Sequence, residues 1–260
     1  MLHKCNTVTA MAKKNHFMPD DCKELCNALI SVSERHSICQ IFEDWLRISA
    51  IAISNAVDWQ FKDERENMYF EITKKYSKKE LERMTDCFAI LVHSLDKAFN
   101  TIGYTDLLGK VFHALNLHNE YHGQFFTPFH ISEFMGKIVA DGKEADIERE
   151  IETKGYISAY EPCIGSGAMM LALAKAMQEK NTNPQQRLVV TGCDIDIKCV
   201  CMSYIQLSLF GIPAVIVHGN SLTLEEWSSW KTPMYIAGFW DSKTNHIGSK
   251  YQTTELVNEN

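Results

Sequence analysis

Apolar residues recur at helical spacing through about the first 120 residues of the chain. Residues 77–99 show the pattern most clearly: Ser77 and Glu80 have the spacing of a capping box, and apolar side chains then return every three or four positions. The segments before and after them carry the same rhythm. We therefore predict a helical domain over residues 1–120, a bundle whose apolar stripes form its core.

From about Tyr156 onward, short β-prone segments alternate with apolar helical segments. The first predicted strand ends at Glu161, the second ends at Asp194, and a third begins in "PAVIVHGNSL". This alternation is typical of a parallel sheet with right-handed crossovers. Residues 121–260 are therefore predicted to form an α/β domain with a Rossmann-like, mainly parallel sheet. The charge-rich segment "ADGKEADIEREIETKG" before it is predicted to be a solvated helix end or a linker.

Composition places the chain among ordinary globular proteins. It has 260 residues, 45% of them hydrophobic and 23% charged, so disorder is not expected. No apolar run approaches the roughly 20 residues that span a bilayer. The N-terminal segment lacks the apolar stretch of a secretory signal, so the cytoplasm is the expected compartment.

The cysteine spacing and the net charge argue against a structural metal and against nucleic-acid binding by this chain alone. The nine cysteines are expected to be reduced thiols, and neither Cys22 with Cys26 nor Cys199 with Cys201 has the spacing of a zinc knuckle, so no metal is predicted. The net charge of −7 argues against broad binding of nucleic acid by this chain alone. If the chain contacts DNA, we expect a partner to supply much of the positive surface.

The segment "EPCIGSG" has the features of a ligand-binding turn between a strand and a helix. Gly165 and Gly167 let the backbone turn and let a ligand approach closely, and Ser166 is expected to cap the following helix. The free N–H groups at the start of that helix suit a carboxylate or a phosphate. Many turns contain G-x-G, so this signal is weak by itself.

Polar residues also follow the second and third predicted strands. Asp194 stands 33 positions after Glu161, where Rossmann-like sheets place an acid on ribose hydroxyls. Asp196 is expected to cap the next helix. Asn220 suits either the edge of an adenine or a turn. The glycines do not follow the G-x-G-x-x-G pattern of nicotinamide cofactors, which favours S-adenosylmethionine over a hydride-transferring dehydrogenase.

Four segments in order, between Tyr104 and Trp240, together resemble the adenine-N6 DNA methyltransferases, and within them the modification subunits of type I restriction-modification systems. The segments are "GQFFTP", "EPCIGSG", "GCDID" and "HGNSL". The resemblance implies a shortened S-adenosylmethionine methyltransferase domain behind the helical domain, and a loop that folds over the cofactor. The residues that it places on S-adenosylmethionine are Phe126, Thr127, Pro128, Glu161, Gly165, Gly167, Asp194, Ile195 and Asn220.

The chain departs from this family in "WKTPMYIAGFWDSK", where the resemblance places a fourth strand and, after it, the loop with the family's catalytic Asn-Pro-Pro-Phe/Tyr segment. The best alignment puts Gly238, Phe239 and Trp240 in that slot, and Gly238 has no amide to polarise an adenine amine. Phe239 or Trp240 is expected either to stack on a base or to pack in the core. The twenty residues after Trp240 are too few for three further strands, so we expect a short sheet closed by the helical domain, by a partner chain or by a second copy.

Two functions of different classes remain open. The chain is either a minimal S-adenosylmethionine-dependent DNA adenine methyltransferase subunit that depends on a partner, or a non-catalytic regulatory or interaction module of a modification or restriction complex that no longer needs the cofactor. We expect cofactor binding without methyl transfer by the chain alone. Its expected partners are a protein or a second copy, with DNA reached through a partner subunit.

Overall fold

The computed structural model describes residues 19–33, 35–117 and 126–244. The expected boundary at residues 120 and 121, and the residues Gly123 to Phe125 of the "GQFFTP" loop, lie outside these ranges. Six helical elements lie in the described residues before the loop: α2 (Asp20–Val32), α3 (Ile38–Asn55), η2 (Trp59–Phe61), α4 (Lys62–Thr73), α5 (Lys78–Ile102) and α6 (Leu107–Ala114).

The capping box predicted before α5 is confirmed. The Ser77 side chain accepts a hydrogen bond from the backbone N–H of Glu80, and the Glu80 carboxylate accepts one from the backbone N–H of Ser77 at 2.7 Å. The apolar face of α5 then packs against α2 and α3, where the buried Trp45 indole donates to the Met84 carbonyl at 3.1 Å. The helical periodicity of the sequence therefore predicts this part of the fold correctly.

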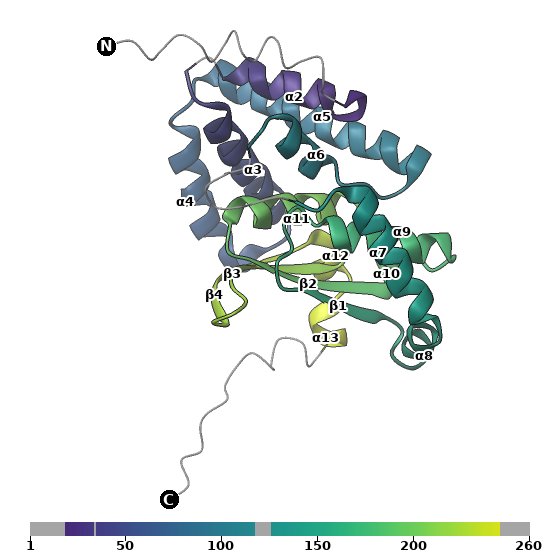
Figure 1. Cartoon of the computed structure of the whole chain (residues 1–260). Coiled ribbons are helices and arrows are strands. Elements are labelled where there is room, and N and C mark those ends of the chain that lie inside the picture. The colour runs from purple at the N-terminus through teal and green to yellow at the C-terminus, as the bar shows by residue number, and fades with distance from the viewer. Residues whose placement is uncertain (1–18, 34, 118–125, 245–260) are drawn as a thin grey trace, which may run out of the picture.

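The second part of the chain forms a four-stranded sheet in the order β1-β2-β3-β4 (Figure 1). β1, β2 and β3 are parallel, and β4 returns antiparallel to β3. The fold is thus α/β with a mixed, mostly parallel sheet. The elements are α7 (Phe129–Gly142), α8 (Glu144–Lys154), β1 (Ile157–Glu161), α9 (Ala168–Glu179), α10 (Pro184–Arg187), β2 (Leu188–Asp194), α11 (Ile197–Leu209), β3 (Ala214–Asn220), β4 (Glu225–Lys231), α12 (Pro233–Ala237) and α13 (Trp240–Lys243).

The two faces of the sheet are covered very differently. Alternate strand residues, such as Val190 and Ile216, join one large core with apolar residues of α3, α9 and α11, which lie above the strands in Figure 1. The residues between them, such as Val189, join a smaller cluster with Tyr235 and Trp240 of the short helices α12 and α13, against which Tyr156 and Val215 pack. Among the described residues, the rest of that second face borders a groove of about 350 Å³.

The end of the sheet differs from the sequence prediction. The segment "WKTPMYIAGFWDSK" was expected to hold a fourth strand and a loop, but most of it forms α12 and α13. The reason is local: the Thr232 side chain accepts a hydrogen bond from the Tyr235 N–H, and Pro233 occupies the first turn, where its missing N–H costs nothing. The fourth strand lies earlier, in the polar sequence "EEWSSWK".

Two further observations bear on the expected classes of site. The eight cysteines in the described ranges are free thiols, and in those ranges no three His, Cys, Asp or Glu side chains group as metal ligands. None of the described helices has the length and apolar character needed to cross a bilayer.

Candidate functional site

The carboxyl ends of the three parallel strands meet at one edge of the sheet. The register aligns Glu161 of β1 with Gly192, and Asp194 of β2 with His218 of β3. Asn220 is the last residue of β3. The three polar residues that the sequence places at strand ends therefore share one edge, where open α/β sheets bind their ligands.

The loop between β1 and α9 turns on its two predicted glycines. Gly165 has a φ of 55° and Gly167 a φ of 93°, a region that residues with a Cβ seldom adopt. Gly167 is the N-cap of α9 and offers no side chain to the helix. The expectation that Ser166 caps α9 is therefore wrong, and the first N–H groups of this helix face no capping side chain.

Asp194 ties the glycine loop to the end of β2. Its Oδ2 accepts a hydrogen bond from the Gly165 N–H and its Oδ1 accepts one from the Asp196 N–H, both at 2.9 Å. Burial is the main cause that raises the pKa of Asp194, and these hydrogen bonds oppose it. The Cys199 side chain is a third hydrogen-bond partner of this carboxylate. A carboxylate has about four lone-pair sites, so the group can still accept one hydroxyl. The next residue, Ile195, is 62% exposed and offers an apolar surface beside it.

Three other polar side chains at the carboxyl ends of the strands accept hydrogen bonds from backbone N–H groups close to them in the chain. Asp196 caps α11 by accepting from the Lys198 N–H at 2.9 Å, as predicted. Glu161 accepts from the Cys163 N–H at 3.2 Å, inside its own loop. Asn220 was expected either to bind the edge of an adenine or to form a turn. Its Oδ1 accepts hydrogen bonds from the backbone N–H groups of Leu222 and Thr223, so in this structure it forms the turn.

Phe126 lies directly over the glycine loop. A Cβ added to Gly165 would stand 3.2 Å from the Phe126 ring. On its other side the ring packs against Phe112, with centroids 4.6 Å apart. Phe126 is thus both a neighbour of the loop and a partner of the core, while Thr127 and Pro128 are exposed just before α7.

A buried polar network lies behind the glycine loop, and the sequence analysis does not predict it. Ser166 Oγ donates to Asp106 Oδ2 at 2.6 Å, and Gln206 Nε2 donates to Asp106 Oδ1 at 2.9 Å and to the Ser166 carbonyl at 2.8 Å. Asp106 also caps α6 through the Gly109 N–H. Its place before an apolar helical segment predicts the cap, but no sequence signal predicts the contact with Ser166, 60 positions away.

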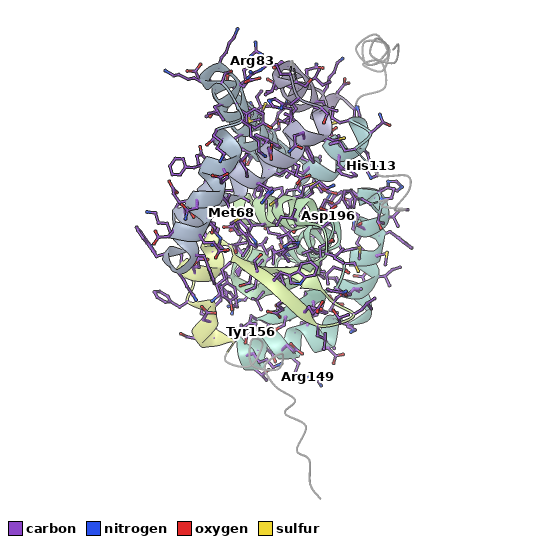
Figure 2. The ribbon with its side chains drawn as sticks, turned by 90° about the vertical axis from the view of Figure 1, so that its left-hand side faces the viewer. Met68, Arg83, His113, Arg149, Tyr156 and Asp196 are labelled. Carbon is purple, nitrogen blue, oxygen red and sulfur yellow. The ribbon has the colours of Figure 1, made fainter. Side chains whose placement is uncertain are left out.

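The residues aligned with the family's catalytic segment, Gly238, Phe239 and Trp240, lie at the opposite end of the sheet, beside the amino ends of the parallel strands. Because β4 is antiparallel, it starts beside Asn220 and ends beside Val215, so the segment after it emerges at the amino end of the parallel strands. Trp240 is 2% exposed and its ring contacts Tyr156, just before β1, at 5.2 Å. Figure 2 shows Tyr156 near the lower end of the molecule, well below Asp196.

This position corrects the alignment of Gly238, Phe239 and Trp240 with the catalytic slot. Trp240 has the core role of its two alternatives, and Phe239 is exposed but distant in the topology from the glycine loop and Asp194. Gly238 is held between α12 and α13, where a Cβ would stand 2.5 Å from the Trp240 indole nitrogen. None of the three can stack on a base at the strand ends.

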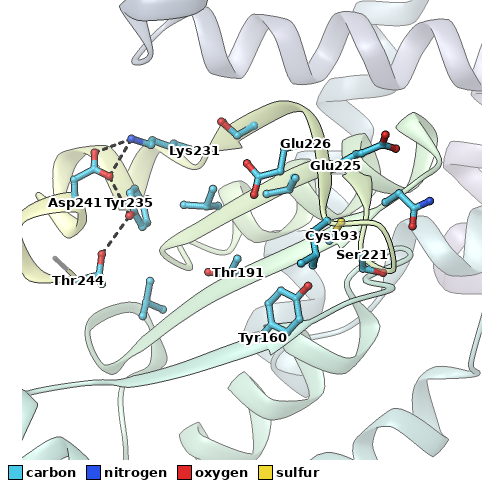
Figure 3. A pocket seen from close by; sticks show the side chains of 16 residues that line it. Tyr160, Thr191, Cys193, Ser221, Glu225, Glu226, Lys231, Tyr235, Asp241 and Thr244 are labelled. Carbon is cyan, nitrogen blue, oxygen red and sulfur yellow. Dashed lines mark hydrogen bonds and ion pairs between the residues drawn. The ribbon is translucent and has the colours of Figure 1, made fainter. Parts of the chain in front are cut away.

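The groove on the open face of the sheet is a separate feature (Figure 3). It runs from Ser221 and Cys193 at the carboxyl ends of the strands toward Lys231 and Asp241 at the other end. Of the residues predicted to bind the cofactor, Asn220 lines it.

Comparison with known proteins gives the family of the chain. A search of curated proteins found no match. A solved structure of a proposed class I S-adenosylmethionine-dependent methyltransferase from Listeria monocytogenes aligns with a TM-score of 0.42 and 11% identity. The alignment covers 83% of this chain but only 55% of that protein, so the chain spans about half of its length.

The family comparison covers the glycine loop, Asp194, Asn220 and the buried Asp106. The model of the N-6 DNA methylase family matches residues 104–256, which is more than half of the chain. The chain therefore belongs to the N-6 DNA methylase family.

Proposed function

We propose that the chain binds S-adenosylmethionine at the carboxyl ends of β1, β2 and β3, as a relative of type I restriction-modification methylase subunits that transfers no methyl group alone. One observation carries the proposal: the Gly165 N–H donates to the Asp194 carboxylate and so joins the glycine turn to the strand-end acid. A glycine turn at the start of a helix and an acid at the end of the next strand are the two elements with which Rossmann-like sheets hold the nucleoside part of a cofactor.

The residues present fit this cofactor. Asp194 has one lone-pair site left for a ribose hydroxyl, and the uncapped N–H groups at the start of α9 suit the cofactor's carboxylate. Phe126 would border the bound molecule, since its ring already lies against Gly165. When bound, S-adenosylmethionine supplies an electrophilic methyl group, and the chain's own residues hold and orient it.

We infer impaired catalysis because the segment aligned with the family's catalytic residues does not reach the carboxyl ends of the parallel strands. Transfer to an adenine amine requires acceptors that polarise the amine hydrogens. In the described residues the fourth strand is antiparallel, and the segment after it leaves from the opposite edge. We propose that a partner protein supplies the missing acceptors and the contact with DNA, which the net charge of −7 disfavours for this chain alone.

One observation favours the alternative, an interaction module without cofactor. The Phe126 ring packs on both the glycine loop and Phe112, so it occupies space beside Gly165. If this packing is permanent, the strand ends serve as scaffold for a modification or restriction complex.

Isothermal titration with S-adenosylmethionine separates the two. We expect micromolar binding, about −8 kcal/mol, by the wild type and its loss in Asp194→Ala. Asp241→Ala is the matched control, because Asp241 is an exposed aspartate at the opposite edge, paired with Lys231. If the folded wild type gives no heat of binding, the chain is instead the interaction module without cofactor.

Methyl transfer is tested separately with labelled cofactor and adenine-containing DNA. We expect no incorporation by the chain alone. Incorporation that Asp194→Ala abolishes would show that the chain is a complete enzyme.

A further inference from the structure

Two contacts join helix α6 to the glycine loop between β1 and α9. The polar contact is the hydrogen bond from Ser166 Oγ to Asp106, the N-cap residue of α6. The apolar contact runs through Phe126, whose ring packs against Phe112 of α6 on one side and lies over Gly165 on the other. The helical part of the chain therefore reaches the loop by two separate routes.

The polar contact belongs to a network that water does not reach. Asp106, Ser166 and Gln206 are all almost fully buried. The Ser166 hydroxyl donates to Asp106 and the Ser166 carbonyl accepts from Gln206, so the residue is fixed at two atoms. Gln206 Oε1 in turn accepts from the Leu108 N–H of α6 at 3.0 Å. A buried polar group that loses its partner has no water to replace it, so each hydrogen bond of the network supports the others.

Gly109 leaves the space in which the Asp106 carboxylate meets the loop. A Cβ at position 109 would stand 2.0 Å from Asp106 Oδ2, the oxygen that accepts from Ser166. Any side chain there would push this oxygen out of contact with the loop. The cap of α6 uses the other oxygen, Oδ1, which accepts from the Gly109 N–H. Asp106 and Gly109 thus do more than begin a helix.

Ser166 holds the part of the loop on which the proposed cofactor site depends. Its neighbour Gly165 donates to Asp194, and its neighbour Gly167 begins α9, whose uncapped N–H groups suit the cofactor's carboxylate. Both glycines have positive φ. Because they lack a Cβ, the loop backbone alone has many accessible conformations. The hydrogen bonds of Ser166 select one of them.

We propose that α6, through Asp106, positions the glycine loop for S-adenosylmethionine, and that bound cofactor in turn stabilises α6. The inference rests on the proposed function. Asp106 is a positioning residue, because it acts on the site through Ser166. A site whose binding-competent conformation is only partly populated binds more weakly in the same proportion. Coupling between two sites is reciprocal. In Figure 1, α6 lies between α2 and α11, so the helical part of the chain has a direct effect on the site.

Isothermal titration of Ser166→Ala with S-adenosylmethionine tests the positioning role. The expected affinity is about tenfold below that of the wild type, the equivalent of about 1.4 kcal/mol or one hydrogen bond. Ser132→Ala is the matched control, because Ser132 is equally buried and its hydroxyl has no hydrogen-bond partner among the described residues. Unchanged affinity in Ser166→Ala would overturn this inference alone, whereas no binding by the folded wild type would overturn the proposed function as well.

Asp106→Ser separates positioning from capping. Serine caps a helix about as well as aspartate, but its side chain is shorter and carries one oxygen instead of two, so the contact with Ser166 is lost. We expect the same loss of affinity as in Ser166→Ala, and no further loss in the double variant, because both changes remove one contact. Losses that add would mean that the two residues act separately, against the inference. Melting curves confirm that each variant is folded.

Hydrogen exchange on the wild type tests the reciprocal effect without a substitution. Bound cofactor should slow the exchange of the Leu108 and Gly109 N–H groups, which donate to side chains of the network. The control is the Glu80 N–H at the start of α5, which donates to the Ser77 side chain outside the network. Equal slowing of all three N–H groups would indicate a general stabilisation of the fold and would overturn the coupling through α6.

Discussion

At the scale of single residues, the Asp194 carboxylate has a structural role besides the binding role proposed for it. It accepts hydrogen bonds from the backbone N–H groups of Gly165 and Asp196, and its burial raises its pKa. A raised pKa means that the proton is taken up at a higher pH than by an exposed aspartate. The charged form, which accepts hydroxyls, is therefore lost early as the solution is acidified.

We expect the affinity for S-adenosylmethionine to be constant near neutral pH and to fall as the pH drops through this raised pKa. In Asp194→Asn, binding should be weaker and independent of pH over the same range, because the amide does not titrate. Isothermal titration from about pH 8 down to about pH 4, near the ordinary pKa of an aspartate, measures both. Equal pH dependence in wild type and variant would assign the effect to another group.

Single residues also show how far the sequence predicts the site. The roles of Asp196 and of the two loop glycines are decided by neighbours within a few positions, so the sequence predicts them. Ser166 was expected to cap α9 because it lies just before that helix. Its buried hydrogen-bond partner, Asp106, is 60 positions away in the chain, so the sequence does not predict their contact. Local hydrogen bonds can thus be inferred from spacing, whereas a contact that depends on tertiary packing cannot.

At the scale of elements, the start of α5 depends on ionised Glu80. Hydrogen bonds from Arg35, and then from Ser77, lower the pKa of Glu80 from its ordinary 4.5 to about 2. An acid with a lowered pKa stabilises the fold fully above its ordinary value, and this stabilisation is lost as the pH falls toward the folded-state value.

We therefore expect Glu80→Gln to lower the melting temperature at neutral pH and to matter progressively less between pH 4.5 and about 2. Melting curves of wild type and variant across this range measure the difference. Lys78→Gln, which removes only an exposed charge from the same turn, is the control. A difference that stays constant down to about pH 2 would show that Glu80 acts through packing and not through its charge.

The elements that the sequence predicts well are those with strong periodicity. The helices α2, α3, α5 and α6 and the strands β1 to β3 are of this kind. β4 was missed because "EEWSSWK" is mostly exposed, so burial imposes little pattern on it. Its antiparallel direction follows from the short turn after Asn220, and this turn decides where the rest of the chain emerges.

At the scale of the whole molecule, Arg65 joins the helices to the sheet. Its guanidinium pairs with Asp58 at 2.7 Å, donates to the Ser229 carbonyl of β4 at 2.8 Å and stacks on Trp230 at 4.3 Å. Arg65 and Asp58 are both almost fully buried. One continuous apolar core also runs from α2 to β3.

We expect Arg65→Met to lower the free energy of unfolding by about 3–5 kcal/mol, because it leaves the Asp58 carboxylate buried without its partner. The double variant Asp58→Leu with Arg65→Met should recover part of this loss, since no lone charge remains. Urea unfolding followed by circular dichroism measures both. If the double variant is as unstable as the single one, the contact with β4 matters more than the ion pair.

The direction of β4 also affects the order in which the sheet can assemble. β3 and β4 are consecutive in the chain and joined by a short turn, so in a refolding chain this hairpin can close within microseconds. β1 and β2 must wait until α9 and α10 bridge them. On the ribosome the order is reversed, because β1 and β2 emerge first. We therefore expect the sheet to assemble from β3 and β4 in a refolding chain and from β1 and β2 on the ribosome, and pulsed hydrogen exchange on refolding and nascent chains measures the difference.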